Sequence, residues 1–242
     1  MPGYGFSDRP SRPQHVRALD LYHALMTDGL GYQRFAIAGS DIGLGIATRM
    51  ALEHPGAVSG IHVTGVVDPP NERRGAPYTE NERRYLAEAE RWEADESAYQ
   101  AMQSTRPQTV AFALNDSPVG LASWILEKFH AWSDLRTGDM FTLYGDALLD
   151  NLMVYWVTGT IGSSMRLYYE SKRWPRPFAP DARVRVPTSV LVTPGDLARP
   201  PREWAERMYD VRRYVVAATG GHFPALEIPG LYIDELRAGL AH

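Results

Sequence analysis

The chain has 242 residues, of which 44% are hydrophobic and 11% aromatic, enough for a sizeable core in one large domain or two small ones. Its net charge of −4 provides no basic surface for nucleic acid, and the absence of cysteine excludes disulfides, thiolate metal sites and cysteine nucleophiles. No apolar stretch approaches the roughly 20 residues of a membrane span, and no signal peptide is recognisable, so we expect a cytoplasmic protein.

The N-terminal part of the chain predicts an α/β arrangement. After a segment rich in Pro and Gly, residues 15–30 have helical periodicity and residues 34–38 form a short apolar strand. A helix over 43–53 and a strand over 59–67 follow. A strand, a helix and a strand in so short a stretch are typical of a right-handed parallel crossover.

The middle of the chain predicts helices and no strand. Helical patterns cover residues 79–94, 96–104, 118–132, 145–158 and 163–170. Because so long a helical insertion between strands is typical of a lid, we expect an all-helical cap over residues 69–180.

Strand character returns near the C-terminus, at residues 188–193 and 213–218, each followed by a helical pattern. We therefore expect an α/β fold with a parallel sheet of about four strands. Residues 1–68 and 181–242 would form its two parts, on either side of the cap.

A sharp turn lies in the stretch FAIAGSDIGLGIATRM, residues 35–50. Gly39, Asp41 and Gly43 form the pattern G-x-D-x-G, which is a nucleophile elbow with Asp in place of Ser. The elbow would project the Asp41 carboxylate beside a helix N-terminus, where the helix dipole keeps it ionised. On these residues alone, an ordinary helix N-cap explains Asp41 equally well.

Two further polar residues follow strands at the same edge of the predicted sheet. Asp196 comes after the strand over 188–193, and His222 lies in a Gly-Gly-His-Phe loop after the last strand. The sequence order nucleophile, acid, histidine is that of α/β-hydrolases. Asp68, which ends the second strand, is a competing acid, but the Gly195 turn favours Asp196.

At this point the chain resembles the epoxide hydrolases of microsomal type, within the α/β-hydrolase superfamily. The resemblance covers almost the whole chain, and the stretches that carry it are PGYGFSDRP, AGSDIGLGIA, STRPQTVAFALNDSPVGLASWILEKFHAW, SSMRLYYES and ATGGHFPALEIP.

The resemblance implies a reaction that needs no cofactor and no metal. Asp41 would open a small apolar epoxide to give an ester, and His222, oriented by Asp196, would activate the water that hydrolyses the ester to a vicinal diol. The family also uses two cap tyrosines to donate a proton to the epoxide oxygen, and the matching positions are Tyr99 and Tyr168. Tyr169 is the adjacent rival to Tyr168.

In that family the PGYGFS segment follows the fourth strand of the sheet, so the resemblance implies that the preceding strands and a His-Gly-x-Pro loop are missing here. The Ile42 N–H would remain as the oxyanion donor, which makes activity weak or absent. The strand over 34–38 would be an exposed edge, through which the chain associates with a second copy or with a complementing chain.

Three other functions are consistent with some of these residues. A haloalkane dehalogenase uses the same Asp nucleophile and His base, but it holds halide with N–H donors such as indoles, whereas Tyr99 and Tyr168 favour an epoxide. A serine hydrolase would need Ser40 at the apex, one residue out of register with Gly39 and Gly43. The third is a non-catalytic remnant that acts only with a complementing chain.

Overall fold

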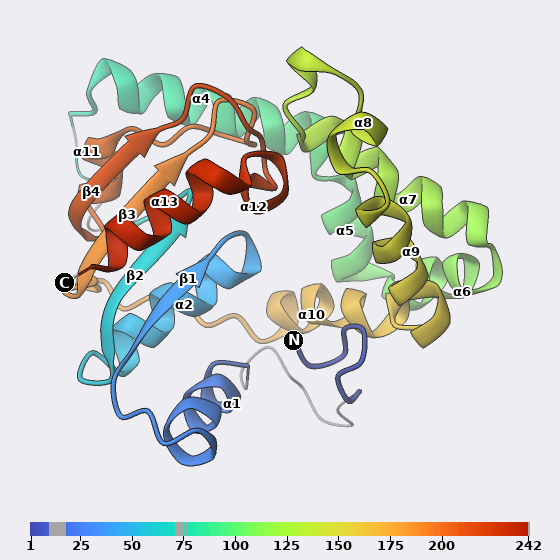
Figure 1. Cartoon of the computed structure of the whole chain (residues 1–242), viewed down its shortest axis with the longest axis horizontal. Coiled ribbons are helices and arrows are strands. Elements are labelled where there is room, and N and C mark those ends of the chain that lie inside the picture. The colour runs from blue at the N-terminus through green and yellow to red at the C-terminus, as the bar shows by residue number, and fades with distance from the viewer. Residues whose placement is uncertain (10–17, 71–74, 76, 242) are drawn as a thin grey trace. The chain divides into compact units, whose positions relative to one another are not determined.

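The structure is a computed structural model that describes residues 1–9, 18–70, 75 and 77–241 (Figure 1). The chain divides into two compact units. Met1–Ala18 and Glu93–Arg176 form the first, which we call the helical unit, and Leu19–Trp92 and Pro177–His242 form the second, which we call the sheet unit.

The sheet unit contains four strands in the described part of the chain. Its elements are α1 (Ala18–Ala24, whose first residue belongs to the other unit), the π-helical turn η1 (Leu25–Gly29), β1 (Phe35–Gly39), α2 (Ile42–Glu53), β2 (Val58–Thr64), the first three turns of α4 (Glu80–Glu96), β3 (Pro187–Val192), α11 (Arg202–Glu206), β4 (Asp210–Val216), α12 (Pro224–Glu227) and α13 (Pro229–Leu240). The predicted helix over 15–30 corresponds to α1 and η1, and its first residues lie outside the described ones.

The helical unit contains the end of α4, α5 (Ala98–Thr105), α6 (Pro107–Asp116), α7 (Pro118–Trp132), the short turn η2 (Leu135–Thr137), α8 (Met140–Tyr144), α9 (Ala147–Thr158) and α10 (Ile161–Arg173). None of the helices in the described ranges is long and apolar enough to cross a membrane.

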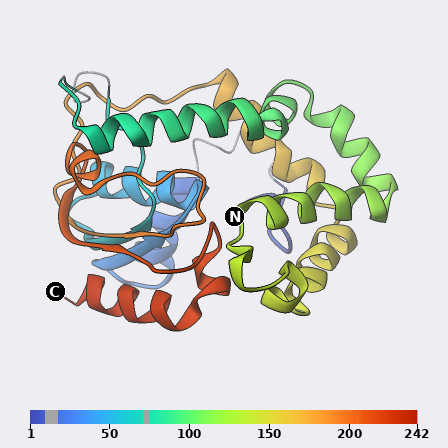
Figure 2. The same ribbon diagram turned by 90° about the horizontal axis from the view of Figure 1, so that it is seen from above.

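The strands form a single parallel sheet of four, as the sequence predicts, and their order is β1-β2-β3-β4. Figure 2 shows α2 on one face of this sheet and α13 on the other. Side chains alternate along β2: Ile61 and Val63 join the core beneath α2, whereas His62 lies against α13. Because all four strands are parallel, the loops that follow them meet at one edge of the sheet.

Within the described residues β1 is an edge strand, because its one strand partner is β2. Its Phe35 side chain is buried, while Ala36 and Ala38 are exposed. Association through this edge stays a prediction.

The main segment of the helical unit begins at Glu93, whereas the cap was expected to begin at residue 69. A capping box begins α4: Thr79 and Glu82 exchange hydrogen bonds of 2.9 and 3.1 Å between backbone N–H and side-chain oxygen. The buried Glu82 carboxylate also accepts bonds of 2.6 and 2.9 Å from the Arg207 guanidinium, next to α11. This ion pair explains why α4 belongs with the sheet as far as Trp92.

The N-terminal segment also differs from the expectation, because it belongs to the helical unit and not to the hydrolase core. Ser163 donates a 2.6 Å hydrogen bond to the carbonyl of Gly3, and the Tyr4 hydroxyl donates to the carbonyl of Ser164 at 3.1 Å. These bonds attach Gly3 and Tyr4 to the first turn of α10, 160 residues away in the sequence.

Three described helices were not predicted: α6, α8 and α12. In α6 the apolar residues Val110, Phe112 and Leu114 alternate, which hides the helical period. The structure buries Val110 and Leu114, four residues apart, and exposes Phe112. The other two helices are a single turn each, too short for periodicity to reveal.

Candidate active site

The turn between β1 and α2 has the geometry of a nucleophile elbow. Asp41 lies between them with φ 49° and ψ −122°, and it is the one residue other than glycine with a positive φ in the described parts of the chain. A side chain rarely adopts this conformation, and such strain is typically retained at functional sites. Asp41 also occupies the N-cap position, so the two interpretations of the sequence describe the same residue.

The two glycines of the elbow do not have the same role. A Cβ on Gly39 would lie 2.3 Å from the Gly43 carbonyl oxygen, so only glycine fits there. A Cβ on Gly43 would meet nothing within 4 Å. The pattern G-x-D-x-G therefore requires glycine at its first position, whereas at Gly43 it is the backbone carbonyl that lies close to β1.

We expect Gly39→Ala to lower the free energy of unfolding by about 1–3 kcal/mol, because the added methyl group forces β1 away from α2. Gly43→Ala is the matched control, and it should leave stability unchanged or raise it by up to ~1 kcal/mol, since alanine is the better helix former. Urea unfolding followed by circular dichroism measures both. Equal losses in the two variants would contradict this account of the elbow.

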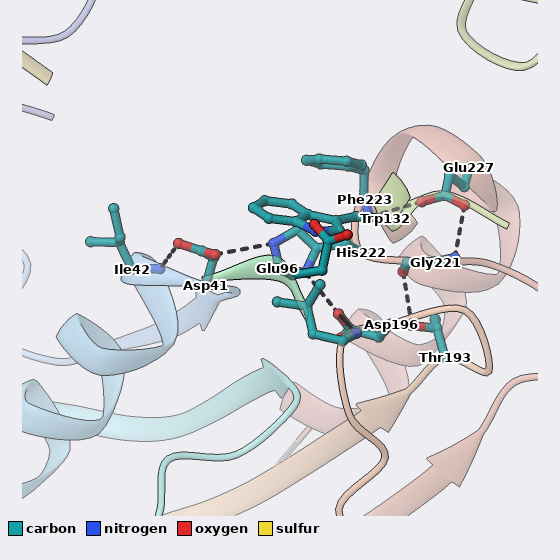
Figure 3. Close-up of polar contacts among 11 residues, drawn as sticks. Asp41, Ile42, Glu96, Trp132, Thr193, Asp196, Gly221, His222, Phe223 and Glu227 are labelled. Atoms are coloured by element: carbon teal, nitrogen blue, oxygen red, sulfur yellow. Dashed lines mark hydrogen bonds and ion pairs between the residues drawn. The ribbon is translucent and has the colours of Figure 1, made fainter. Parts of the chain in front are cut away.

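The elbow, the loop after β3 and the loop after β4 bring three predicted residues together (Figure 3). His222 Nδ1 lies 2.7 Å from Asp196 Oδ1, and His222 Nε2 lies 3.1 Å from Asp41 Oδ2. The imidazole is 9% exposed and thus joins the two carboxylates at hydrogen-bonding distance in a largely buried position. This is the geometry of a nucleophile, a base and an orienting acid.

The two competing residues lie elsewhere. Asp68 Oδ1 accepts a 3.3 Å hydrogen bond from the Trp204 indole. Ser40 precedes the apex, and its carbonyl accepts a bond from the N–H of Leu44 in the first turn of α2. Asp196 is accordingly the carboxylate that lies at hydrogen-bonding distance from His222 Nδ1, as the sequence predicts for the orienting acid.

The contacts within this group shift the pKa values of His222 and Asp41. Desolvation alone would lower the pKa of His222, but the hydrogen bonds and charges of Asp196 and Asp41 outweigh it and raise that pKa to about 9. Desolvation would likewise raise the pKa of Asp41, but the bond from His222, its positive charge and the Ile42 N–H lower it below its usual value. At neutral pH the resting site therefore holds an imidazolium between two carboxylates.

The predicted oxyanion donor is already engaged by the elbow residue. The Ile42 N–H donates a 2.5 Å hydrogen bond to Asp41 Oδ1, whereas Oδ2 is the oxygen that faces His222. The two oxygens of the Asp41 carboxylate therefore have different partners: Oδ2 faces the His222 imidazole, and Oδ1 accepts the bond from the Ile42 N–H at the start of α2.

Tyr99 and Tyr168 lie in the helical unit, on α5 and α10. Their rings are in T-shaped contact, with centroids 6.0 Å apart. Tyr99 also packs edge-on against Trp132, and the Lys128 ammonium lies 5.1 Å from the centre of the Tyr99 ring. The structure therefore brings together the two tyrosines that were predicted to act as a pair, with Tyr168 and not Tyr169 in ring contact with Tyr99.

The sequence did not reveal what holds the His222 loop. The buried Thr193 hydroxyl donates a 2.8 Å bond to the carbonyl of Gly221, and the Glu227 carboxylate accepts bonds from the N–H groups of Gly221 and Phe223 (Figure 3). A Glu five residues after the histidine was the available signal. In the described ranges no three His, Asp or Glu side chains are grouped as a metal ion would require.

No family model matches the chain, but it is similar to several known proteins. The chain is 37% identical to epoxide hydrolase 1 of Sus scrofa in an alignment 262 positions long, which covers 98% of this chain and 58% of that protein. It superposes on the crystal structure of juvenile hormone epoxide hydrolase from Bombyx mori with a TM-score of 0.87 and 31% identity, over 100% of this chain and 62% of the other. Against the Aspergillus niger epoxide hydrolase the TM-score is 0.83, with 26% identity and coverage of 100% and 61%.

The chain spans 54–58% of the length of the curated relatives that it matches. Within that span the elbow, the acid loop and the histidine loop are all present, on the parallel sheet that the solved relatives share. The chain has the α/β-hydrolase fold, and along almost its whole length it is similar to epoxide hydrolases.

Proposed function

We propose that the protein hydrolyses a small apolar epoxide to a vicinal diol through a covalent ester on Asp41. The observation that carries the proposal is the His222 imidazole, which lies within hydrogen-bonding distance of both Asp41 and Asp196. A carboxylate with an adjacent oriented base suits a reaction in which an ester forms and is then hydrolysed.

In the first step Asp41 Oδ2 attacks an epoxide carbon, the ring C–O bond breaks, and its electron pair remains on the ring oxygen. That oxygen takes a proton from a tyrosine hydroxyl, and we assign this role to Tyr99 and Tyr168, which are neutral donors at pH 7. The product is a hydroxyalkyl ester of Asp41.

In the second step His222 takes a proton from water, and the oxygen of that water attacks the Asp41 carbonyl carbon. Charge develops on Oδ1, which the Ile42 N–H already binds at 2.5 Å. The bond from that carbon to Oδ2 then breaks, Oδ2 takes the proton held by His222, and the diol leaves. The second proton of the water is lost from the Asp41 carboxyl group and returns through solvent to the tyrosine that gave its proton in the first step. Esterification removes the Asp41 charge that helps to raise the pKa of His222, so the imidazole loses its proton at lower pH once the ester has formed.

Styrene oxide in H₂¹⁸O tests this function, with the protein in excess so that each molecule turns over once. We expect phenylethanediol without ¹⁸O, and ¹⁸O in the peptide that contains Asp41, because the water oxygen replaces Oδ2. A diol that carries ¹⁸O would indicate direct attack by water and contradict the covalent mechanism.

A second substrate in the same assay tests the dehalogenase alternative. If the protein released bromide from 1-bromobutane and left styrene oxide unchanged, it would be a dehalogenase. The cytoplasmic location stays a prediction from the sequence.

A further inference from the structure

The His222 loop receives little support from regular secondary structure. It runs from the end of β4 at Val216 to the start of α12 at Pro224, and it contains Gly220 with φ 103°. A Cβ at Gly220 would lie 2.9 Å from the Ile228 side chain, so the backbone passes close to its neighbours there. The direction of the imidazole therefore depends on individual hydrogen bonds to this loop.

One side chain binds the backbone on both sides of the histidine. Glu227 Oε2 accepts a 2.7 Å hydrogen bond from the N–H of Gly221, and Oε1 accepts a 2.9 Å bond from the N–H of Phe223 (Figure 3). Both oxygens are thus used on the residues directly before and after His222. An ionised acceptor makes such bonds stronger than a neutral one would.

We propose that Glu227 is a positioning residue, which fixes the peptide around His222 so that Nδ1 faces Asp196 while Nε2 faces Asp41. This inference rests on the proposed function and assigns a further residue to it. Glu227 lies at the end of α12, so the same short helix that follows the loop holds the loop in place.

The other contacts of the loop limit what the loss of Glu227 would do. Thr193 holds the carbonyl of Gly221 at 2.8 Å, and the Gly195 N–H holds the carbonyl of Gly220 at 2.9 Å. These bonds remain in a Glu227 variant, as do the backbone bonds of 2.9 Å from the N–H groups of Leu226 and Glu227 to the carbonyl of Phe223. The loop therefore stays attached on both sides, and only the N–H groups of Gly221 and Phe223 lose their carboxylate acceptor. The expected effect is a misdirected imidazole within a folded protein.

Glu227→Gln tests the proposal, because the amide keeps the size of the side chain but directs an NH₂ group at a backbone N–H. His222 acts as the base only in the second step, so we expect ester hydrolysis to slow by about 10–100-fold, as small misplacements of catalytic groups do. Ester formation should change by less than about threefold, because the nucleophile is held by Ile42. Rapid quench with styrene oxide and mass spectrometry of the ester separates the two rates.

Glu235→Gln is the matched control. Glu235 accepts hydrogen bonds of 2.6 and 2.8 Å from Arg213 in the same unit, and these bonds involve none of the three active-site residues. Both rates should stay within about twofold of the parent protein. If Glu227→Gln slowed both steps equally, or neither, the proposal would be overturned.

A measurement without turnover separates failure of this inference from failure of the proposed function. In the unreacted protein, NMR titration of the imidazole should give a lower pKa for His222 in Glu227→Gln than in the parent, where it is about 9, because misdirection weakens its bonds to both carboxylates. An unchanged pKa overturns the positioning role. A parent protein that forms no ester with any epoxide overturns the proposed function, while the titration still decides on Glu227.

Discussion

Asp41→Asn is expected to lower epoxide turnover by on the order of 10⁴-fold or more, the size of loss seen when a covalent nucleophile is removed. The amide is neutral and a poor nucleophile, but it keeps the shape of the side chain and an oxygen that can accept the Ile42 N–H bond. The strained elbow should therefore survive, and thermal unfolding should resemble that of the parent. Diol formation from styrene oxide, measured by gas chromatography, is the readout.

Ser40→Ala is the control for this prediction. Ser40 is the neighbouring hydroxyl residue, and its backbone carbonyl, which the substitution retains, makes the bond to Leu44. We expect its activity to stay within about twofold of the parent. If Ser40→Ala abolished activity and Asp41→Asn kept it, the protein would be a serine hydrolase.

The same Asp41 variant has an effect on pH behaviour. Asp41 raises the pKa of His222 by its hydrogen bond and its charge, so the neutral amide should bring that pKa down from about 9, while Asp196 still raises it. The imidazole then loses its proton at a lower pH than in the parent. NMR titration of both proteins measures this difference, and an unchanged value would show that Asp41 and His222 are not in contact in solution.

The sheet and the three active-site loops were predictable because local features specify them. Short apolar runs, rich in β-branched residues in the second strand, predicted the strands, and the glycines around Asp41 predicted the turn. In a parallel sheet the ends of β1, β3 and β4 lie at one edge. The convergence of Asp41, Asp196 and His222 could therefore be predicted without predicting the conformations of the loops.

Features that depend on contacts between distant segments could not be predicted in the same way. Gly39 and Gly43 have equivalent positions in the sequence pattern, but only a Cβ on Gly39 would collide with backbone atoms. Thr79 and Glu82 predict the start of a helix, but no feature of the neighbouring sequence predicts that Glu82 pairs with Arg207 and attaches α4 to the sheet. The role of Glu227 is likewise visible only once the loop backbone is placed.

His222→Gln should convert the protein from a catalyst into one that traps its substrate. Glutamine cannot take a proton from water, so hydrolysis of the ester should slow by about 10²–10⁴-fold. Ester formation needs Asp41 and a proton donor to the epoxide oxygen, and both remain. Intact mass spectrometry after incubation with styrene oxide should therefore show one adduct on each chain, located by peptide mapping to Asp41.

The mass of that adduct identifies the reaction. Ring opening has no leaving group, so the protein gains the full mass of the epoxide, whereas a haloalkane would lose its halide and add only the alkyl group. The double variant Asp41→Asn/His222→Gln should gain nothing, because it lacks the attacking carboxylate. Steady diol production by His222→Gln without an adduct would show that the imidazole is not the base, and the geometry at Nε2 would then need another explanation. An adduct that forms and persists instead assigns the two steps to two different residues: Asp41 opens the ring, and His222, held by Asp196, releases the product.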